Sequence, residues 1–404
     1  MTTPTKIKHL VVGTPQGVAG NLLKEARYAF NYSAHESPCE VSLTMPLRAE
    51  SYASGALMPV FEMNRPEGYL LYKIEEAFAK VGGLDDMRLL DIVGGQQIGR
   101  LSYARPDERR EAKTRQIGLK EILQRKPTSE LFDFLVATYF ESGISGVQPK
   151  VLVPDDDRST PAAERETVVH ADLIVKSGDA EFPHLTQNEF MCMTAARAAG
   201  IETPRFWLSD DGGLFVVERF DLKDGKPLGF EDMAVLMNKT SRQKYEGSYE
   251  NVAKAVRLYC AEADSLADLH RLFEYIAFMV MVRNGDGHLK NFGLLYEHPG
   301  ARGSVRLAPL YDVVTTSLYG ATNLRTYITK YDRTLALNLR KSKSYPDLET
   351  LLRFGREVCQ VARPMDVIER IAEALSDTLK EHRTRIAEEL WRGLSVEWGM
   401  PARR

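Results

Sequence analysis

Two short polar loops interrupt the helical pattern in the C-terminal part of the chain, and they limit its possible folds more than any other feature. Apolar residues recur at helical spacing in four segments, residues 249–258, 266–282, 348–361 and 367–391. The loops, residues 284–295 and 307–316, fall between the second and third of these segments. Polar loops held by a helical scaffold are typical of functional sites. The sequence therefore predicts a helical domain over residues 226–404 with its chemistry in these loops.

The first loop contains Asp286 and Asn291, separated by five positions as in the catalytic loop of protein kinases. There the carboxylate accepts the proton of the incoming hydroxyl, and the amide oxygen binds Mg²⁺. His288 and Lys290 add polar and cationic groups beside the predicted phosphate path. The alternative is a polar turn in which Asp286 and Asn291 cap helix ends.

The second loop contains Asp312, 21 positions after Asn291. Residues 292–296 and 305–307 between them are typical of a hairpin. In kinases a second metal-binding aspartate follows the catalytic loop across such a hairpin. Asp312 lacks the Phe-Gly that follows this aspartate in eukaryotic kinases, and the alternative is a helix N-cap.

A strand and a helix further upstream supply a candidate ion pair. Residues 168–175 are rich in β-branched side chains and predict a strand that ends at Lys176. The helix that follows has a predicted capping box, Thr186 and Glu189, and ends near Gly200. In kinases a strand lysine grips the α- and β-phosphates and is aligned by a helix glutamate. Lys176 and Glu189 are candidates for these roles, with a solvated surface lysine as the alternative.

Two further segments are candidates for nucleotide contacts. Residues 141–150 hold two glycines and two serines before a strand, and free backbone N–H groups in such a loop can cradle phosphate. The strand 214–220 ends with Glu218 and Phe220, which would form a hinge whose backbone reads adenine. The alternatives are an ordinary hairpin turn and an ordinary strand end.

The first 125 residues predict a small α+β module for packing or interaction. Strands are expected at 10–13 and 28–32, with a glycine turn at Gly17 and Gly20. A helix over 70–81 would end at Gly82-Gly83, and the charged stretch 104–115 reads as a linker.

Composition excludes several classes of protein. Lys+Arg 53 against Asp+Glu 56 gives a net charge of −3, which argues against a dedicated DNA binder. The four cysteines form no C-x-x-C pair, so we expect buried or idle thiols in a reducing compartment. The N-terminus has no apolar signal core, and the longest apolar stretch is far below the roughly 20 residues that span a bilayer. We expect a soluble cytoplasmic protein without membrane contact.

These motifs together resemble the HipA-type serine/threonine kinases, the toxins of bacterial HipBA toxin–antitoxin systems. The segments GISGVQPK, NEFMC, VERFD, EDM, NGDGHLKNFGL and LAPLYDV occur in the family's order. The segment MPLRAESYASGALMPVFEMNRPEG resembles the family's N-terminal region, so the resemblance covers nearly the whole chain.

The resemblance implies an α+β, HipA-like two-lobed protein-kinase-like fold. It would have a mixed N-lobe over residues 126–225, an all-helical C-lobe over 226–404 and an extra N-terminal α/β subdomain over 1–125. ATP and Mg²⁺ would bind between the lobes.

The resemblance also assigns roles to residues. Asp286 matches the catalytic base, and Asn291 and Asp312 match the metal ligands. The remaining nucleotide-binding positions are Lys176, Ser145, Gly146, Val147, Gln148, Glu189, Glu218, Phe220 and Tyr311.

The resemblance also implies that the protein causes growth arrest or persistence. Family members phosphorylate aminoacyl-tRNA synthetases such as glutamate–tRNA ligase, and they bind a HipB-like helix-turn-helix antitoxin that represses the operon at operator DNA. They switch themselves off by autophosphorylating a loop serine. Some members carry that serine at the position of Gly143, so Ser145 is the first candidate here and Ser142 the second.

Two other functions remain open from sequence alone. The chain could act mainly as an antitoxin-bound co-repressor on DNA with weak kinase activity, through basic stretches such as residues 340–343. It could also phosphorylate a small molecule. The sequence gives neither the substrate, the antitoxin nor the oligomeric state.

Overall fold

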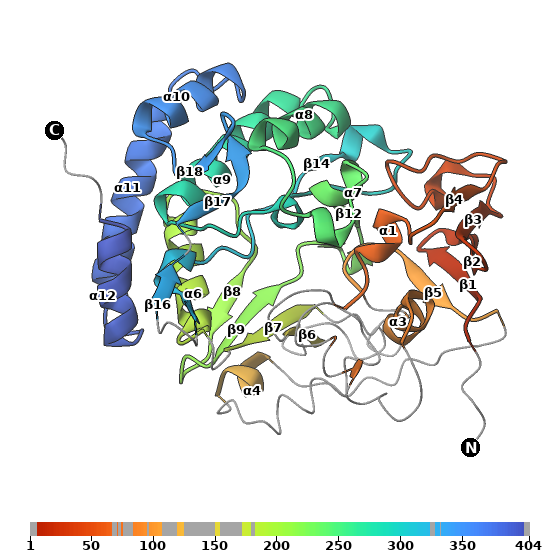
Figure 1. The fold of residues 1–404 in the computed structure, drawn as a ribbon, viewed down its shortest axis with the longest axis horizontal. Coiled ribbons are helices and arrows are strands. Elements are labelled where there is room, and N and C mark those ends of the chain that lie inside the picture. Colours follow the sequence, from red (N-terminus) through yellow and green to blue (C-terminus); the bar gives the residue numbers. More distant parts are fainter. Residues whose placement is uncertain are drawn as a thin grey trace.

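The computed structural model describes residues 6–66, 71, 74–75, 84–94, 97–106, 119–124, 150–153, 172–178, 182–323, 328–331 and 333–399. An N-terminal subdomain, residues 6–106 as far as described, lies at one side of the molecule, and the last helices run along the opposite edge (Figure 1). Within the described ranges, no helix combines the length and apolarity needed to cross a membrane.

The N-terminal subdomain is built on an antiparallel five-stranded sheet of order β4-β3-β2-β1-β5. Its strands are β1 (His9–Thr14), β2 (Gly17–Lys24), β3 (Tyr28–Tyr32), β4 (Tyr52–Ser54) and β5 (Ser102–Ala104). Its helical pieces are η1 (Ser37–Cys39), α1 (Pro59–Glu62) and α3 (Asp86–Val93). The strands expected at 10–13 and 28–32 are confirmed. Of the expected helix 70–81 and linker 104–115, most residues lie outside the described ranges.

The expected glycine turn is only partly right. Gly17, at φ +135°, follows the β1–β2 turn, but Gly20 lies inside β2. A Cβ built on Gly20 would come within 2.1 Å of the carbonyl oxygen of Asn31 on β3. Gly20 therefore serves close strand packing rather than the turn.

The second unit is an antiparallel four-stranded sheet of order β6-β7-β9-β8 with one helix against it. Its elements are β6 (Lys150–Val153), β7 (Leu173–Ser177), α6 (Leu185–Ala198), β8 (Phe206–Leu208) and β9 (Leu214–Glu218). The short helix α4 (Leu119–Gln124) precedes β6 in the chain. Figure 1 shows α6 between this sheet and the C-terminal helices. The predicted order of strand, helix, strand, strand is confirmed.

The predicted capping box at the start of α6 is wrong. His184 occupies the N-cap position at φ 59°, and the hydroxyl of Thr186 donates to the carbonyl of Gly212 at 2.7 Å. Glu189 turns away from the helix start toward Lys176. Both side chains have tertiary partners that outcompete local capping. Gly200, at φ +73°, does follow the end of the helix as expected.

The C-terminal part contains the predicted amphipathic helices. These are α7 (Met233–Leu236), α8 (Tyr249–Tyr259), α9 (Ser265–Met281), α10 (Leu348–Glu357), α11 (Pro364–Glu381) and α12 (Glu388–Glu397). Helix α9 is deeply buried, with an unbroken buried run from Tyr275 to Val280. The single helix expected over 367–391 is two, α11 and α12. All four cysteines are free and buried, as expected.

The prediction of an all-helical C-lobe is wrong. A three-stranded sheet of order β12-β13-β14 includes the end of the first polar loop and the start of the second, and is built from β12 (Gly229–Asp232), β13 (Gly293–Tyr296) and β14 (Arg306–Leu307). Further hairpins are β10 (Leu222–Lys223) with β11 (Lys226–Pro227), β15 (Gly320–Asn323) with β16 (Ile328–Tyr331), and β17 (Thr334–Leu339) with β18 (Ser342–Ser344). Most of these strands are too short for side-chain alternation to reveal them. The hairpin expected between the two loops is confirmed as β13–β14.

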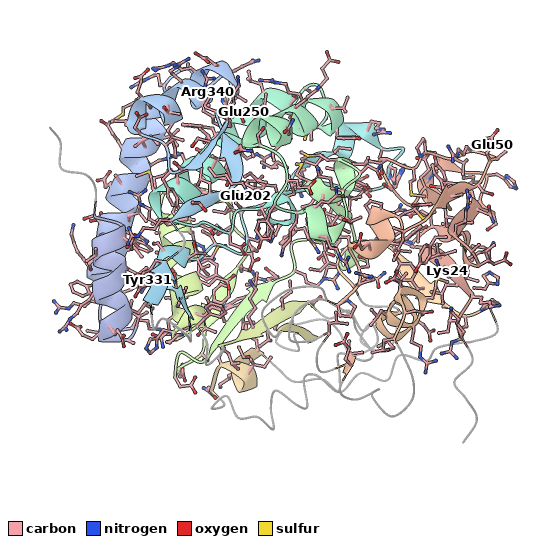
Figure 2. The ribbon with its side chains drawn as sticks, in the orientation of Figure 1. Lys24, Glu50, Glu202, Glu250, Tyr331 and Arg340 are labelled. Carbon is pink, nitrogen blue, oxygen red and sulfur yellow. The ribbon has the colours of Figure 1, made fainter. Side chains whose placement is uncertain are left out.

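Glu202, labelled in Figure 2, connects three parts of the chain. It follows α6, and its carboxylate accepts a hydrogen bond from the guanidinium of Arg271 on α9 at 2.5 Å. Its backbone carbonyl accepts from the N–H of Leu310 at 2.9 Å, two residues before Asp312. The segment after α6 therefore holds the second polar loop in place.

Candidate functional site

Lys176 on β7 joins two acidic residues that are distant in sequence. Its ammonium lies 2.6 Å from a carboxylate oxygen of Glu189 on α6 and 2.6 Å from one of Asp312 in the second polar loop. The side chains of Lys176 and Glu189 are 6% and 1% exposed, while that of Asp312 is 36% exposed. The pair predicted from sequence is thus a buried ion pair, and Asp312 is its solvent-facing third member.

The charges around Lys176 keep it protonated. Burial by itself lowers the pKa of Lys176, but the carboxylates of Asp312 and Glu189 outweigh burial and hold that pKa above its ordinary value. The alternative of a solvated surface lysine is therefore wrong. A fixed cation in this position can bind phosphate oxygens.

Asn291 and Asp312 lie side by side. The amide of Asn291 donates to the second carboxylate oxygen of Asp312 at 3.1 Å. Asp312 has φ +60°, a left-handed conformation that a residue other than glycine seldom adopts, so the surrounding structure holds it there.

The capping alternative is also right for Asn291, because its amide oxygen accepts from the N–H of His288 at 3.1 Å and closes the short helix η3 (Leu289–Asn291).

The side chains of Asn291 and Asp312 suit a hard cation such as Mg²⁺. A carboxylate and an amide oxygen are ligands that Mg²⁺ takes together with phosphate oxygens. Within the described residues, no group of three His, Cys, Asp or Glu side chains could hold a metal by itself. A cation held by Asn291 and Asp312 would take its further ligands from water or phosphate oxygens.

Asp286 is fixed by its backbone and capped by a tyrosine. Its N–H donates to the side chain of Asn284 at 2.9 Å, and the N–H of Gly285 donates to the hydroxyl of Thr316 at 2.6 Å. The hydroxyl of Tyr245, a residue that is 43% exposed, donates to the carboxylate of Asp286 at 2.8 Å. The Asp286 carboxylate therefore faces a hydroxyl in a partly open setting.

The first polar loop is closed by one N–H that two acceptors share. The N–H of His288 lies 2.7 Å from the carbonyl of Asp286 and 3.1 Å from the amide oxygen of Asn291. The carbonyl of Lys290 accepts from the hydroxyl of Tyr311 at 2.8 Å, which ties the first polar loop to the second. The structure thus brings the loop's predicted residues into one constellation with Tyr311 and Asp312.

His288 is buried and neutral at pH 7. Burial lowers its pKa to about 3, the ammonium groups of Lys244 and Lys290 act in the same direction, and the carboxylate of Asp312 acts against them. Its ring packs edge-on against Tyr245 with centroids 5.1 Å apart. His288 therefore adds a polar ring without charge to the site.

This burial predicts a pH dependence of stability. Below the unfolded-state pKa of about 6.5, the unfolded chain binds a proton at His288 that the folded chain does not, so the free energy of unfolding falls by up to about 1.4 kcal/mol per pH unit. The contribution is fully present above that pH and is lost as the pH falls toward 3. Urea unfolding at pH 7 and pH 5 should show a loss about 2 kcal/mol larger in wild type than in His288→Gln. Equal losses would contradict the buried neutral state.

Phe220 and Tyr311 stack on each other, but Glu218 points elsewhere. The two rings lie 5.1 Å apart at 25°, and Phe230 meets Phe220 edge-on at 5.6 Å. The carboxylate of Glu218 instead forms an ion pair with Arg205 at 2.5 Å. The carboxylate of Glu218 is therefore not the predicted hinge contact, and its N–H already donates to the carbonyl of Arg205 at 2.8 Å.

The remaining predicted residues, Ser142, Ser145, Gly146, Val147 and Gln148, lie outside the described residues. Sequence reasoning missed Tyr245 and Thr316. Thr316 ends the predicted second loop, but nothing in the sequence signals Tyr245.

Comparisons with known proteins identify the family. The profile of the HipA N-terminal domain matches residues 10–104, and that of the HipA-like C-terminal domain matches residues 142–383. The putative kinase Y4mE of Sinorhizobium fredii is 28% identical over 310 residues, 70% of each chain. A putative kinase of Haemophilus influenzae is 30% identical over 196 residues, 44% of this chain and 53% of that protein.

A solved structure matches the whole fold. A chain of the Shewanella oneidensis complex of HipA, HipB and operator DNA has a TM-score of 0.71 and 18% identity, over 96% of this chain and 95% of that one. The fold is thus the mixed α/β HipA-like fold with an N-terminal β-sheet subdomain. The chain belongs to the HipA family, which confirms the resemblance drawn from its motifs.

Proposed function

We propose that the chain is an ATP-dependent serine/threonine protein kinase of a toxin–antitoxin system. The observation that carries the proposal is the convergence of Lys176, Glu189 and Asp312, with Asn291 beside them. A buried lysine aligned by a helix glutamate, next to an aspartate and an asparagine, is the arrangement that protein kinases use for phosphoryl transfer. The family's putative kinases in Sinorhizobium and Haemophilus support the same activity.

Each residue would have a distinct task. Lys176 would bind the α- and β-phosphates, with Glu189 positioning it. Asn291 and Asp312 would hold Mg²⁺, which neutralises phosphate charge when bound. For Asn291 to present its oxygen to the metal, the amide would have to rotate, because its nitrogen now faces Asp312. Phe220 and Tyr311 would contact the adenine.

The reaction itself would use Asp286. The hydroxyl of a serine or threonine would donate to this carboxylate as the hydroxyl of Tyr245 does now. As the acceptor oxygen bonds to the γ-phosphorus, the bond to the β-phosphate oxygen breaks, ADP leaves and the proton passes to Asp286.

The family suggests the cellular role. We infer that the target is an aminoacyl-tRNA synthetase, that the chain acts in the cytoplasm, and that Ser145 or Ser142 is autophosphorylated to switch it off. The Shewanella complex supports a HipB-like antitoxin and operator DNA as partners.

Phosphate transfer from labelled ATP tests the proposal. Phosphatase-treated protein and a bacterial extract should give labelled bands with Mg²⁺, and EDTA present before ATP is added should prevent labelling until Mg²⁺ is restored. Mass spectrometry would then identify the labelled proteins and loop serines. Absence of any Mg²⁺-dependent label from the treated wild type would overturn the kinase assignment.

A further inference from the structure

One loop of the N-terminal subdomain, residues 97–99, reaches the predicted nucleotide hinge. The N–H of Gly99 donates to the carboxylate of Asp221 at 2.7 Å, and the guanidinium of Arg219 donates to the carbonyl of Gln97 at 3.0 Å. Arg219 and Asp221 flank Phe220 directly. The loop just before β5 is therefore bonded to both neighbours of the stacked hinge ring.

Arg219 and Asp221 form a buried, two-point ion pair. Two guanidinium nitrogens of Arg219 lie 2.9 Å and 2.6 Å from the two carboxylate oxygens of Asp221. The side chains are only 3% and 2% exposed. Both charges are thus satisfied by each other and by the Gln97–Gly99 backbone, so the hinge position depends on that loop.

A second contact holds the other side of the aromatic cluster. Glu231 is fully buried, and its carboxylate accepts from the hydroxyl of Ser42 at 2.7 Å and from the N–H of Leu43 at 2.8 Å. The hydroxyl of Tyr296 donates to the same carboxylate at 2.6 Å. Because Glu231 follows Phe230 in β12, this contact fixes the ring that meets Phe220 edge-on.

The cluster connects these contacts to the site. Phe220 stacks on Tyr311, and Tyr311 directly precedes Asp312 and hydrogen-bonds to the carbonyl of Lys290. A displacement of the Gln97–Gly99 loop would therefore shift the stacked rings of Phe220 and Tyr311, on the proposed adenine side of the site. It would act on the residues proposed to bind phosphate only through those rings.

We propose that the N-terminal subdomain sets the nucleotide affinity of the kinase lobes, and that Arg219 and Asp221 are its positioning residues. The subdomain is then part of the nucleotide site, in addition to any surface it offers to partners. This inference rests on the proposed function.

Asp221→Asn is the direct test. The N–H groups of Gly99 and Arg219 all point at the carboxylate, and an amide offers only one oxygen to them. We expect KM and the dissociation constant for Mg-ATP to rise about tenfold, with kcat at saturating ATP within about twofold of wild type.

Gly99→Ala is the second variant. Gly99 has φ +89°, which disfavours any side chain, so the substitution should move the same loop. It keeps the test valid if Asp221→Asn does not fold.

Tyr103→Phe is the matched control. It removes a buried hydrogen bond from Asn64 within the same subdomain, at 3.0 Å, without touching the hinge. It should lower the melting temperature and leave the ATP dissociation constant unchanged. If Asp221→Asn and Gly99→Ala fold and bind ATP as tightly as wild type, or if Tyr103→Phe weakens ATP equally, the positioning role is refuted. If wild type itself binds no ATP by calorimetry, the proposed function fails with it.

Discussion

Replacing Asp286 by asparagine is expected to lower the rate of phosphate transfer about 10²–10⁴-fold. The asparagine fits the same space and can still accept a hydrogen bond from Tyr245 or from a substrate hydroxyl. It cannot take up the proton that the hydroxyl must lose. Because Asp286 lies on the acceptor side of the proposed site, ATP affinity should stay within about twofold. Initial rates at saturating Mg-ATP, together with calorimetric ATP binding, measure the two effects separately.

Asp264→Asn is the matched control for this substitution. Asp264 is exposed just before α9, so the same chemical change occurs there on the surface. Transfer rate and stability should match wild type, the latter within about 0.5 kcal/mol. An Asp286→Asn variant that retains the wild-type rate would show that the proton goes elsewhere.

Replacing Lys176 by methionine is expected to abolish detectable ATP binding and to lower the free energy of unfolding by about 3–5 kcal/mol. Methionine fills much of the same volume, but the buried carboxylate of Glu189 loses the charge that compensates it. The carboxylate of Asp312 loses the same partner and gains freedom to move. Urea unfolding and calorimetry with Mg-ATP would record both effects.

A double substitution separates the ion pair from simple packing. Adding Glu189→Gln to Lys176→Met removes the uncompensated charge, so the double variant should be more stable than Lys176→Met alone. Lys254→Met, at an exposed position of α8, should change neither property. A double variant as unstable as the sum of the single ones would contradict the coupling between Lys176 and Glu189.

The sequence predicted the residues of the central constellation because each stands in a local pattern. The five-residue spacing of Asp286 and Asn291 and the hairpin before Asp312 are short-range features of the chain. The structure contains the hairpin and places Asn291 beside Asp312. Lys176 follows from its strand, since β-branched side chains predict that strand from local composition. The long amphipathic helices α8, α9 and α10 were found for the same reason.

The features that were predicted wrongly or missed depend on partners that are distant in the sequence. Thr186 and Glu189 have the spacing of a capping box, but the carbonyl of Gly212 and the ammonium of Lys176 take their side chains instead. Strand β14 has two residues and forms only because β13 lies beside it. Local periodicity cannot reveal an element whose hydrogen bonds come from elsewhere in the chain.

The sequence by itself thus determined the family, the principal helices and the identity of the polar residues in the two loops. Tertiary structure alone decided that the hydroxyl of Tyr245 faces Asp286, and that Gly99 holds Asp221 across 122 positions of sequence. The reason is physical, because a buried polar group takes whichever partner the packed lobes bring within hydrogen-bond distance. That choice is made by the whole fold and leaves no local pattern in the chain.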